Sequence, residues 1–186
     1  MPVLAFRRYG AAGAREIRSA VENIFRDSYT GVAADDLFHS TQEFMRRFDA
    51  YASRDNFDLV VGYDGDEPVG QTWGWPLDER AGKGWWSGLE PEPEPGFTRE
   101  DGKRTFALSE VMVRSAWTGR GIAHALHDEL LSGRHEQRAT LLVRPDNDTA
   151  YSAYRRWGWH KVAQLQPKWP DAPLFDVLIL PLPLKR

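Results

Sequence analysis

The stretch from Glu110 to Ala123 combines an acidic side chain with a glycine-bearing turn. Glu110 lies in an apolar run of strand length, Thr105 to Val113, and Thr118-Gly119-Arg120-Gly121-Ile122-Ala123 follows it. Glycine lets backbone N–H groups face a ligand where a side chain would block the approach, and the positive dipole end of the next helix adds to this. The order therefore predicts an anion site for a phosphate or pyrophosphate. It meets neither the dinucleotide fingerprint, because position 124 is His, nor the P-loop pattern.

A second block of chemically useful residues begins about 25 residues after the glycine turn. It consists of Asn147, Ala150 and Tyr154 on a helix expected from about Asp148 to Trp157, which Gly158 closes. By spacing alone, Tyr154 fits a half-buried aromatic of an amphipathic helix, and Asn147 fits a helix cap.

Taken together, the two blocks resemble the GCN5-related N-acetyltransferases (GNAT). The family signature is Gln or Arg, two residues, Gly, any residue, then Gly or Ala, directly after a strand; this chain matches at Gly121 and Ala123 and has Thr118 in the leading place. The family also shows Asn, two residues, Ala, three residues, Tyr, then Gly and an aromatic. The chain matches that pattern at Asn147, Ala150, Tyr154, Gly158 and Trp159.

The resemblance implies an acetyl-CoA-dependent N-acetyltransferase that acts by direct attack through a tetrahedral intermediate. The aromatic and acidic residues named below favour a primary amine of a small molecule as the acceptor. The resemblance gives Glu110 the role of general base and Tyr154 that of general acid. The residues implied in acetyl-CoA (acyl-CoA) binding are Val111, Met112, Val113, Thr118, Gly119, Arg120, Gly121, Ile122, Ala123, Asn147, Ala150 and Tyr154. Backbone groups at 111–113 can bind the cofactor only if the sheet pairing breaks there. Glu110 can instead be a solvated or arginine-paired glutamate, and Asn147 can simply cap its helix.

The acceptor is expected on the other side of the sheet, among aromatic and acidic residues. The candidate walls are Phe25, Tyr29, Phe38, Trp73, Trp75, Trp85 and Trp86, all of which also suit a core, and Asp27, Asp35 and Asp36 can attract a cationic amine. Residues 77–103 are rich in Gly, Pro and charge and are expected to be irregular, either as a lid or as a solvated insertion.

The hydrophobic patterns place these residues in one α+β domain over residues 1–186. Apolar runs and helical stripes predict the order β-α-α-β-β-β-α-β-α-β-β, with a central mixed, mostly antiparallel β-sheet flanked by helices. Ser40 with Glu43 forms a capping-box pattern, and Asp64-Gly65 joins two strands in a hairpin.

Composition narrows the function classes. The 186 residues carry 24 Lys plus Arg against 27 Asp plus Glu, a net charge of −3, which argues against nucleic-acid binding. With no cysteine there is no thiolate nucleophile, zinc thiolate or disulfide, and no apolar run suits a membrane span. We expect a cytoplasmic protein without nucleic-acid or membrane partners. A homodimer is compatible with the sequence. His124 and His127 lie three apart on one helix, but no cysteine or carboxylate is expected to complete a metal set with them.

Two other functions fit the same residues. One is a non-catalytic acyl-CoA-binding module, and the other is a nucleotide-dependent transferase that uses the glycine turn for another phosphate ligand. Protein N-termini or lysines are alternative acceptors, since fold does not fix function.

Overall fold

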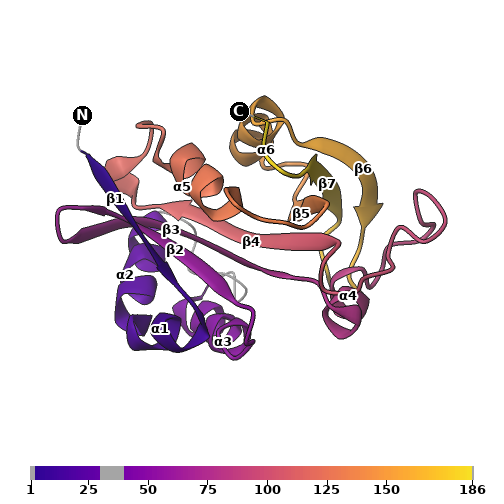
Figure 1. The fold of residues 1–186 in the computed structure, drawn as a ribbon, viewed down its shortest axis with the longest axis horizontal. Helices are drawn as coiled ribbons and strands as arrows, with labels where there is room; N and C mark the ends of the chain where they lie inside the picture. Colours follow the sequence, from indigo (N-terminus) through magenta and orange to yellow (C-terminus); the bar gives the residue numbers. More distant parts are fainter. Residues whose placement is uncertain (1–2, 30–39, 186) are drawn as a thin grey trace. The chain divides into compact units, whose positions relative to one another are not determined.

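A computed structural model describes residues 3–29 and 40–185 (Figure 1). Its elements are β1 (Leu4–Tyr9), α1 (Ala11–Glu16), α2 (Arg18–Ser28), α3 (Thr41–Tyr51), β2 (Asp58–Asp64), β3 (Glu67–Pro76), α4 (Glu79–Trp85), β4 (Thr105–Val113), the 3₁₀ turn η2 (Ser115–Trp117), α5 (Ile122–Leu131), β5 (Arg138–Val143), α6 (Asp148–Arg156), β6 (His160–Leu165) and β7 (Phe175–Pro181). The described strands form a seven-stranded sheet in the order β1-β2-β3-β4-β5-β7-β6.

The sheet is mixed, as the hydrophobic patterns predict. β1 with β2, β2 with β3, β5 with β7 and β6 with β7 are antiparallel, whereas β4 and β5 are parallel. The chain divides into two compact units, Met1–Trp75 with Glu110–Ser132 and Pro76–Ser109 with Gly133–Arg186.

In the first unit, helices cover both faces of the β2–β3 hairpin. Gln71 of β3 donates to the carbonyl of Val21 in α2 (3.1 Å), whereas Gly70 is turned towards Leu126 of α5. This alternation follows from the two-residue period of a strand. Figure 1 shows α1, α2 and α3 on one side of these strands and α5 on the other.

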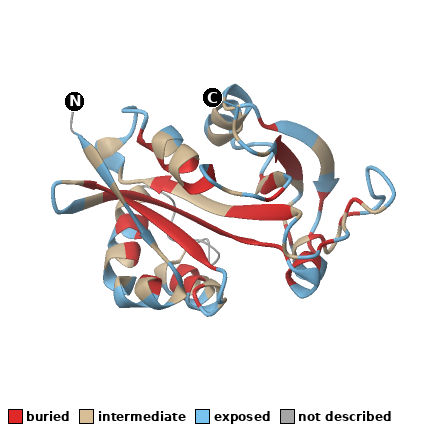
Figure 2. Ribbon diagram, in the orientation of Figure 1, coloured by how far each residue is buried: buried red, intermediate tan, exposed pale blue. Residues whose placement is uncertain are grey.

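Aromatic side chains fill the core between α2, α3 and β3. Phe25 and Phe44 stack with ring centroids 3.8 Å apart, and Trp73 lies 5.6 Å from Phe44 and 5.5 Å from Phe48. Pairs of this kind contribute roughly 0.5–1.5 kcal/mol each beyond the area that they bury. Figure 2 shows the buried residues concentrated on the central strands and on the helix faces turned to them.

In the second unit, the expectation of an irregular segment at 77–103 is wrong for α4. Asp78 caps this helix by accepting from the N–H of Ala81 (2.7 Å), and Gly82 lets the side chain of Glu100 approach closely. The alternating prolines lie after the helix and so do not prevent it. Gly88 also has a positive φ of 90°, and a Cβ there would lie 2.0 Å from the carbonyl oxygen of Gln166.

A buried ion pair ties the end of this segment to β5. The Glu100 carboxylate accepts from Trp86 Nε1 (3.0 Å) and Thr105 Oγ1 (2.8 Å) and lies 3.3 Å from the Arg138 guanidinium. The same guanidinium lies over the ring of Phe97, 4.2 Å from its centroid. Residues 77–103 therefore belong to the core of this unit at their C-terminal end.

Candidate active site

The carboxyl group of Glu110 has a strongly raised pKa. Glu110 is half-buried on β4, and Thr72 Oγ1 donates to its backbone carbonyl (2.7 Å), which fixes the strand at this point. Burial raises the pKa of Glu110 to about 7, and the positive charge of Arg47 opposes part of the rise. A carboxyl group with this pKa can both accept and release a proton near neutral pH.

Two phenols, Tyr29 directly after α2 and Tyr51 at the end of α3, lie within electrostatic range of this carboxyl group. Burial raises the pKa of Tyr29 to about 12, and burial also raises the pKa of Tyr51, with the charge of Glu110 as the second cause for both. Tyr51 packs against Trp75 with ring centroids 4.6 Å apart. Both phenols therefore stay protonated and can donate hydrogen bonds.

The sequence reasoning missed Tyr51 and Arg47 as neighbours of Glu110. Tyr51 belongs to the apolar stripe of its helix with Phe44 and Phe48, so its spacing predicts only core packing. The available signal was a polar hydroxyl on an otherwise apolar stripe, with Arg47 one turn before it.

The parallel pairing of β4 is short, as a cofactor-binding strand would need. Its register with β5 covers Thr105, Phe106 and Ala107, and residues 108–113 lie beyond it. The N–H of Leu77 donates to the carbonyl of Thr105 (2.8 Å), and the N–H of Arg114 donates to the carbonyl of Val69 (2.9 Å). Between these two bonds, the eight residue steps from 69 to 77 lie opposite the nine steps from 105 to 114. This difference of one residue means that the pairing of the two segments is not regular along its whole length.

The glycine turn leads from β4 into α5 as the sequence predicts. Gly119 and Gly121 have φ of 75° and 76°, and no side chain caps the N-terminus of α5 at Gly121. Thr118 Oγ1 donates to the carbonyl of Ser115 (3.0 Å), and the Arg120 guanidinium lies over Trp117, 4.8 Å from the ring centroid. Residues 118–121 are exposed, so this helix start is accessible to an anion.

The second sequence block forms α6 in the second unit. Asn147 Oδ1 accepts from the N–H of Ala150 (3.2 Å), so Asn147 does cap this helix. Tyr154 is half-buried, with its ring centroid 5.6 Å from that of Trp157 and 6.2 Å from that of Trp159. The roles of Asn147, Ala150 and Tyr154 towards a cofactor stay predictions.

The expected acceptor walls are spread over both units. Phe25, Trp73 and Trp75 are buried in the first unit, where Tyr29 is half-buried. In the second unit, Trp86 is buried and Trp85 is half-buried. Among the expected acids, Asp27 pairs with Arg114 (2.7 Å). Phe38, Asp35 and Asp36 lie outside the described residues.

The sequence reasoning also missed a carboxylate beside the two histidines of α5. Asp128 Oδ1 lies 2.8 Å from His127 Nδ1 and 3.5 Å from His124 Nε2. The expectation that no carboxylate completes this group is wrong, because positions 124, 127 and 128 share one face of a helix.

No helix among residues 3–29 and 40–185 is long and apolar enough to cross a membrane.

Solved structures of acetyltransferases share this fold over nearly the whole chain. The ribosomal-protein-S18-alanine N-acetyltransferase of Escherichia coli is 12% identical with a TM-score of 0.64, and the match covers 99% of this chain and 97% of that one. PaiA N-acetyltransferase of Thermoplasma acidophilum, solved in complex with coenzyme A, is 10% identical with a TM-score of 0.60, covering 97% and 99%. Arabidopsis thaliana NAA60, in complex with a bisubstrate analogue, is 16% identical with a TM-score of 0.63, covering 98% and 100%.

No curated protein sequence matches the chain. The model of the acetyltransferase (GNAT) family matches residues 18–159, which include the Glu110 strand, the glycine turn and α6. The chain therefore belongs to the GNAT acetyltransferase family.

Proposed function

We propose that this protein transfers an acetyl group from acetyl-CoA to a primary amine of a small molecule by direct attack. The observation that carries the proposal is Glu110, a half-buried carboxyl group with a pKa raised to about 7 on the strand that leads into the glycine turn. An amine must lose a proton to become a nucleophile, and a base that titrates near the working pH suits that step.

The residues that would hold acetyl-CoA are those of the turn and of the end of β4. The start of α5 offers N–H groups without a side-chain cap, which suits a pyrophosphate, and Val111, Met112 and Val113 lie beyond the pairing with β5. When bound, acetyl-CoA supplies an activated thioester. The backbone N–H groups at 111–113 would polarise its carbonyl.

Two side chains would move protons during the transfer. Glu110 accepts the proton of the acceptor amine, directly or through a water molecule, and Tyr154 donates a proton to the departing thiolate. Tyr29 and Tyr51 orient the acceptor beside Glu110 by hydrogen bonds, because both phenols remain protonated.

A compact acceptor fits this setting better than a broad protein surface. Glu110 is half-buried and lies within electrostatic range of two phenols of the same unit, so we expect the acceptor amine to be carried on a narrow group. The identity of the amine is a matter for a substrate screen.

Calorimetric titration with acetyl-CoA, CoA and ADP in parallel is the first test. Acetyl-CoA is expected to bind more tightly than ADP. Tighter binding of ADP would favour the nucleotide-dependent transferase instead. A thiol-release assay with an amine library, and with peptides bearing free N-termini or lysines, then identifies the acceptor class.

Variants separate catalysis from mere binding. Glu110→Gln and Tyr154→Phe are expected to lower kcat by about 10²–10⁴-fold and to leave acetyl-CoA affinity unchanged. Gly121→Glu is expected to abolish acetyl-CoA binding by placing a charged side chain at a positive φ. Acetyl-CoA binding without turnover of any amine would identify a non-catalytic module.

A further inference from the structure

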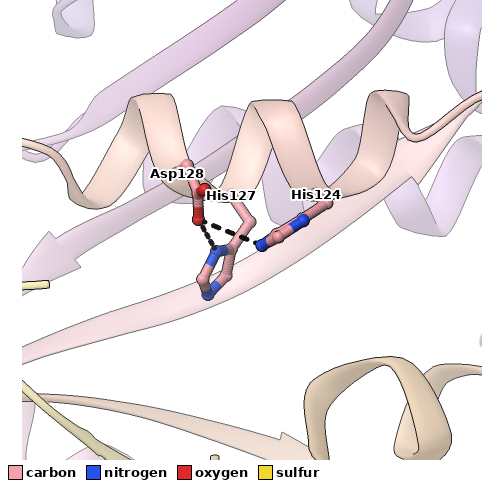
Figure 3. Close-up of side chains that lie close together, drawn as sticks. All are labelled: His124, His127 and Asp128. Atoms are coloured by element: carbon pink, nitrogen blue, oxygen red, sulfur yellow. Dashed lines mark hydrogen bonds and ion pairs between the residues drawn. The ribbon is translucent and has the colours of Figure 1, made fainter. Parts of the chain in front are cut away.

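Helix α5 carries two imidazoles and a carboxylate on one face, at residues to which acyl transfer assigns no role. His124, His127 and Asp128 follow the i, i+3, i+4 spacing that places side chains side by side on a helix. Figure 3 shows the three side chains converging, with interactions from Asp128 to both rings. Imidazole nitrogen and carboxylate oxygen are ligands that zinc binds in proteins.

The two distances from the Asp128 carboxylate to the imidazole nitrogens are close to those between neighbouring ligands of a zinc site. Asp128 Oδ1 lies 2.8 Å from His127 Nδ1 and 3.5 Å from His124 Nε2, and one ligand atom from each residue lies within 4.8 Å of the others. Zinc bonds of about 2.0–2.1 Å in a tetrahedron separate neighbouring ligands by roughly 3.3 Å. The His124 side chain is exposed, and we expect its ring to rotate on binding to bring the set to that geometry.

The burial of the three residues gives the site both a fixed ligand and an entry path. The His127 side chain is 1% exposed, whereas His124 and Asp128 are each 49% exposed. Packing therefore holds one imidazole in place, while an ion can reach the group from solvent through the other two residues. Three protein ligands leave one position for water.

We propose that His124, His127 and Asp128 bind one zinc ion. On binding, the hydrogen bond between His127 Nδ1 and Asp128 Oδ1 is replaced by two bonds to the metal, and the ring proton of His127 resides on Nε2. The ion links the first turn of α5, where His124 directly follows Ala123, to the second turn. The proposal is independent of acyl transfer, because the site is built from α5 alone.

The set also favours transition metals over the hard cations. Two nitrogen donors suit zinc and its neighbours, whereas magnesium and calcium need mainly oxygen ligands. Without a metal, the exposed contact between His124 and Asp128 contributes little to stability.

Titration of the chelator-treated full chain with zinc chloride tests the proposal. One zinc per chain is expected, with magnesium giving no binding, and a cobalt(II) complex should show the visible absorption of a tetrahedral site. His124→Ala and Asp128→Asn change accessible ligands and are each expected to weaken zinc binding about tenfold or more. His160→Ala, an exposed histidine of β6, is the matched control and should bind zinc as the wild type does.

A thermal melt without metal shows that the variants fold, and with zinc the wild type should melt at a higher temperature than without it. His124→Ala should lose this rise. The proposal is overturned if the wild type does not bind zinc, or if His124→Ala and Asp128→Asn bind it as tightly as the wild type.

Discussion

Replacing Glu110 with glutamine is expected to stabilise the fold at alkaline pH while removing the proposed base. Burial raises the pKa of Glu110 from 4.5 to about 7. Each pKa unit corresponds to about 1.4 kcal/mol, so ionised Glu110 destabilises the folded state by up to about 3 kcal/mol. Glutamine has nearly the same shape and cannot ionise.

The pH window of this effect follows from the direction of the shift. Between pH 4.5 and about 7 the folded chain retains a proton that the unfolded chain has released, so the free energy of unfolding of the wild type falls as pH rises. Below pH 4.5 both states are protonated and nothing is lost. Above pH 7 the full cost applies.

Urea unfolding of the ligand-free protein at pH 5 and pH 8 measures the effect. The free energy of unfolding of Glu110→Gln should exceed that of the wild type by up to about 3 kcal/mol at pH 8, and by much less at pH 5. Glu16→Gln, at an exposed position of α1, is the control and should follow the wild type at both pH values. A gain that does not depend on pH, or no gain at pH 8, would refute the idea that burial destabilises the Glu110 carboxylate.

Further substitutions test backbone strain, a buried ion pair and a helix cap. Gly96→Ala is expected to lower the free energy of unfolding by roughly 1–2 kcal/mol, because of its positive φ alone. Gly88→Ala should lower it more, because a backbone carbonyl lies beside its Cβ position. Equal urea midpoints for the two variants would contradict this. Glu100→Gln leaves the Arg138 charge buried without its carboxylate, so it should lower the stability measured by thermal unfolding by about 3–5 kcal/mol. Adding Arg138→Met should restore part of this stability. A loss of less than about 1 kcal/mol in Glu100→Gln would contradict the reasoning. Asn147→Ala should cost about 1 kcal/mol for a lost cap, whereas a fall in acetyl-CoA affinity at unchanged stability would identify a cofactor contact.

Strands and helices with a strong local signal could be predicted from the sequence. Thr105 to Val113 is confirmed as a strand at both ends, and Ser40 caps α3 by accepting from the N–H of Glu43. Gly65 has the positive φ, 59°, that the expected hairpin turn needs. These features depend on neighbouring residues alone, which is why the pattern was sufficient.

Features that depend on distant residues could not be predicted in the same way. α4 contains two glycines and no apolar stripe, and it is fixed by the cap from Asp78 and by packing against Glu100. The surroundings of Glu110 depend on Tyr29 and Tyr51, which lie at the C-terminal ends of two separate helices. The spacing of residues along the chain carries no information about such contacts between distant residues.

The two ends of the 77–103 segment are joined by hydrogen bonds, and this determines where the length of the chain can change. Leu77 donates to the carbonyl of Thr105 and accepts from the N–H of Gly102, both at 2.8 Å, so the two ends meet beside each other. Exposed residues 90–95 can change in length without shifting the strands, whereas Glu100 cannot be replaced without losing its partner on β5. Among related chains, insertions and deletions should therefore gather at this proline-rich tip, and a peptide tag inserted there should leave folding intact.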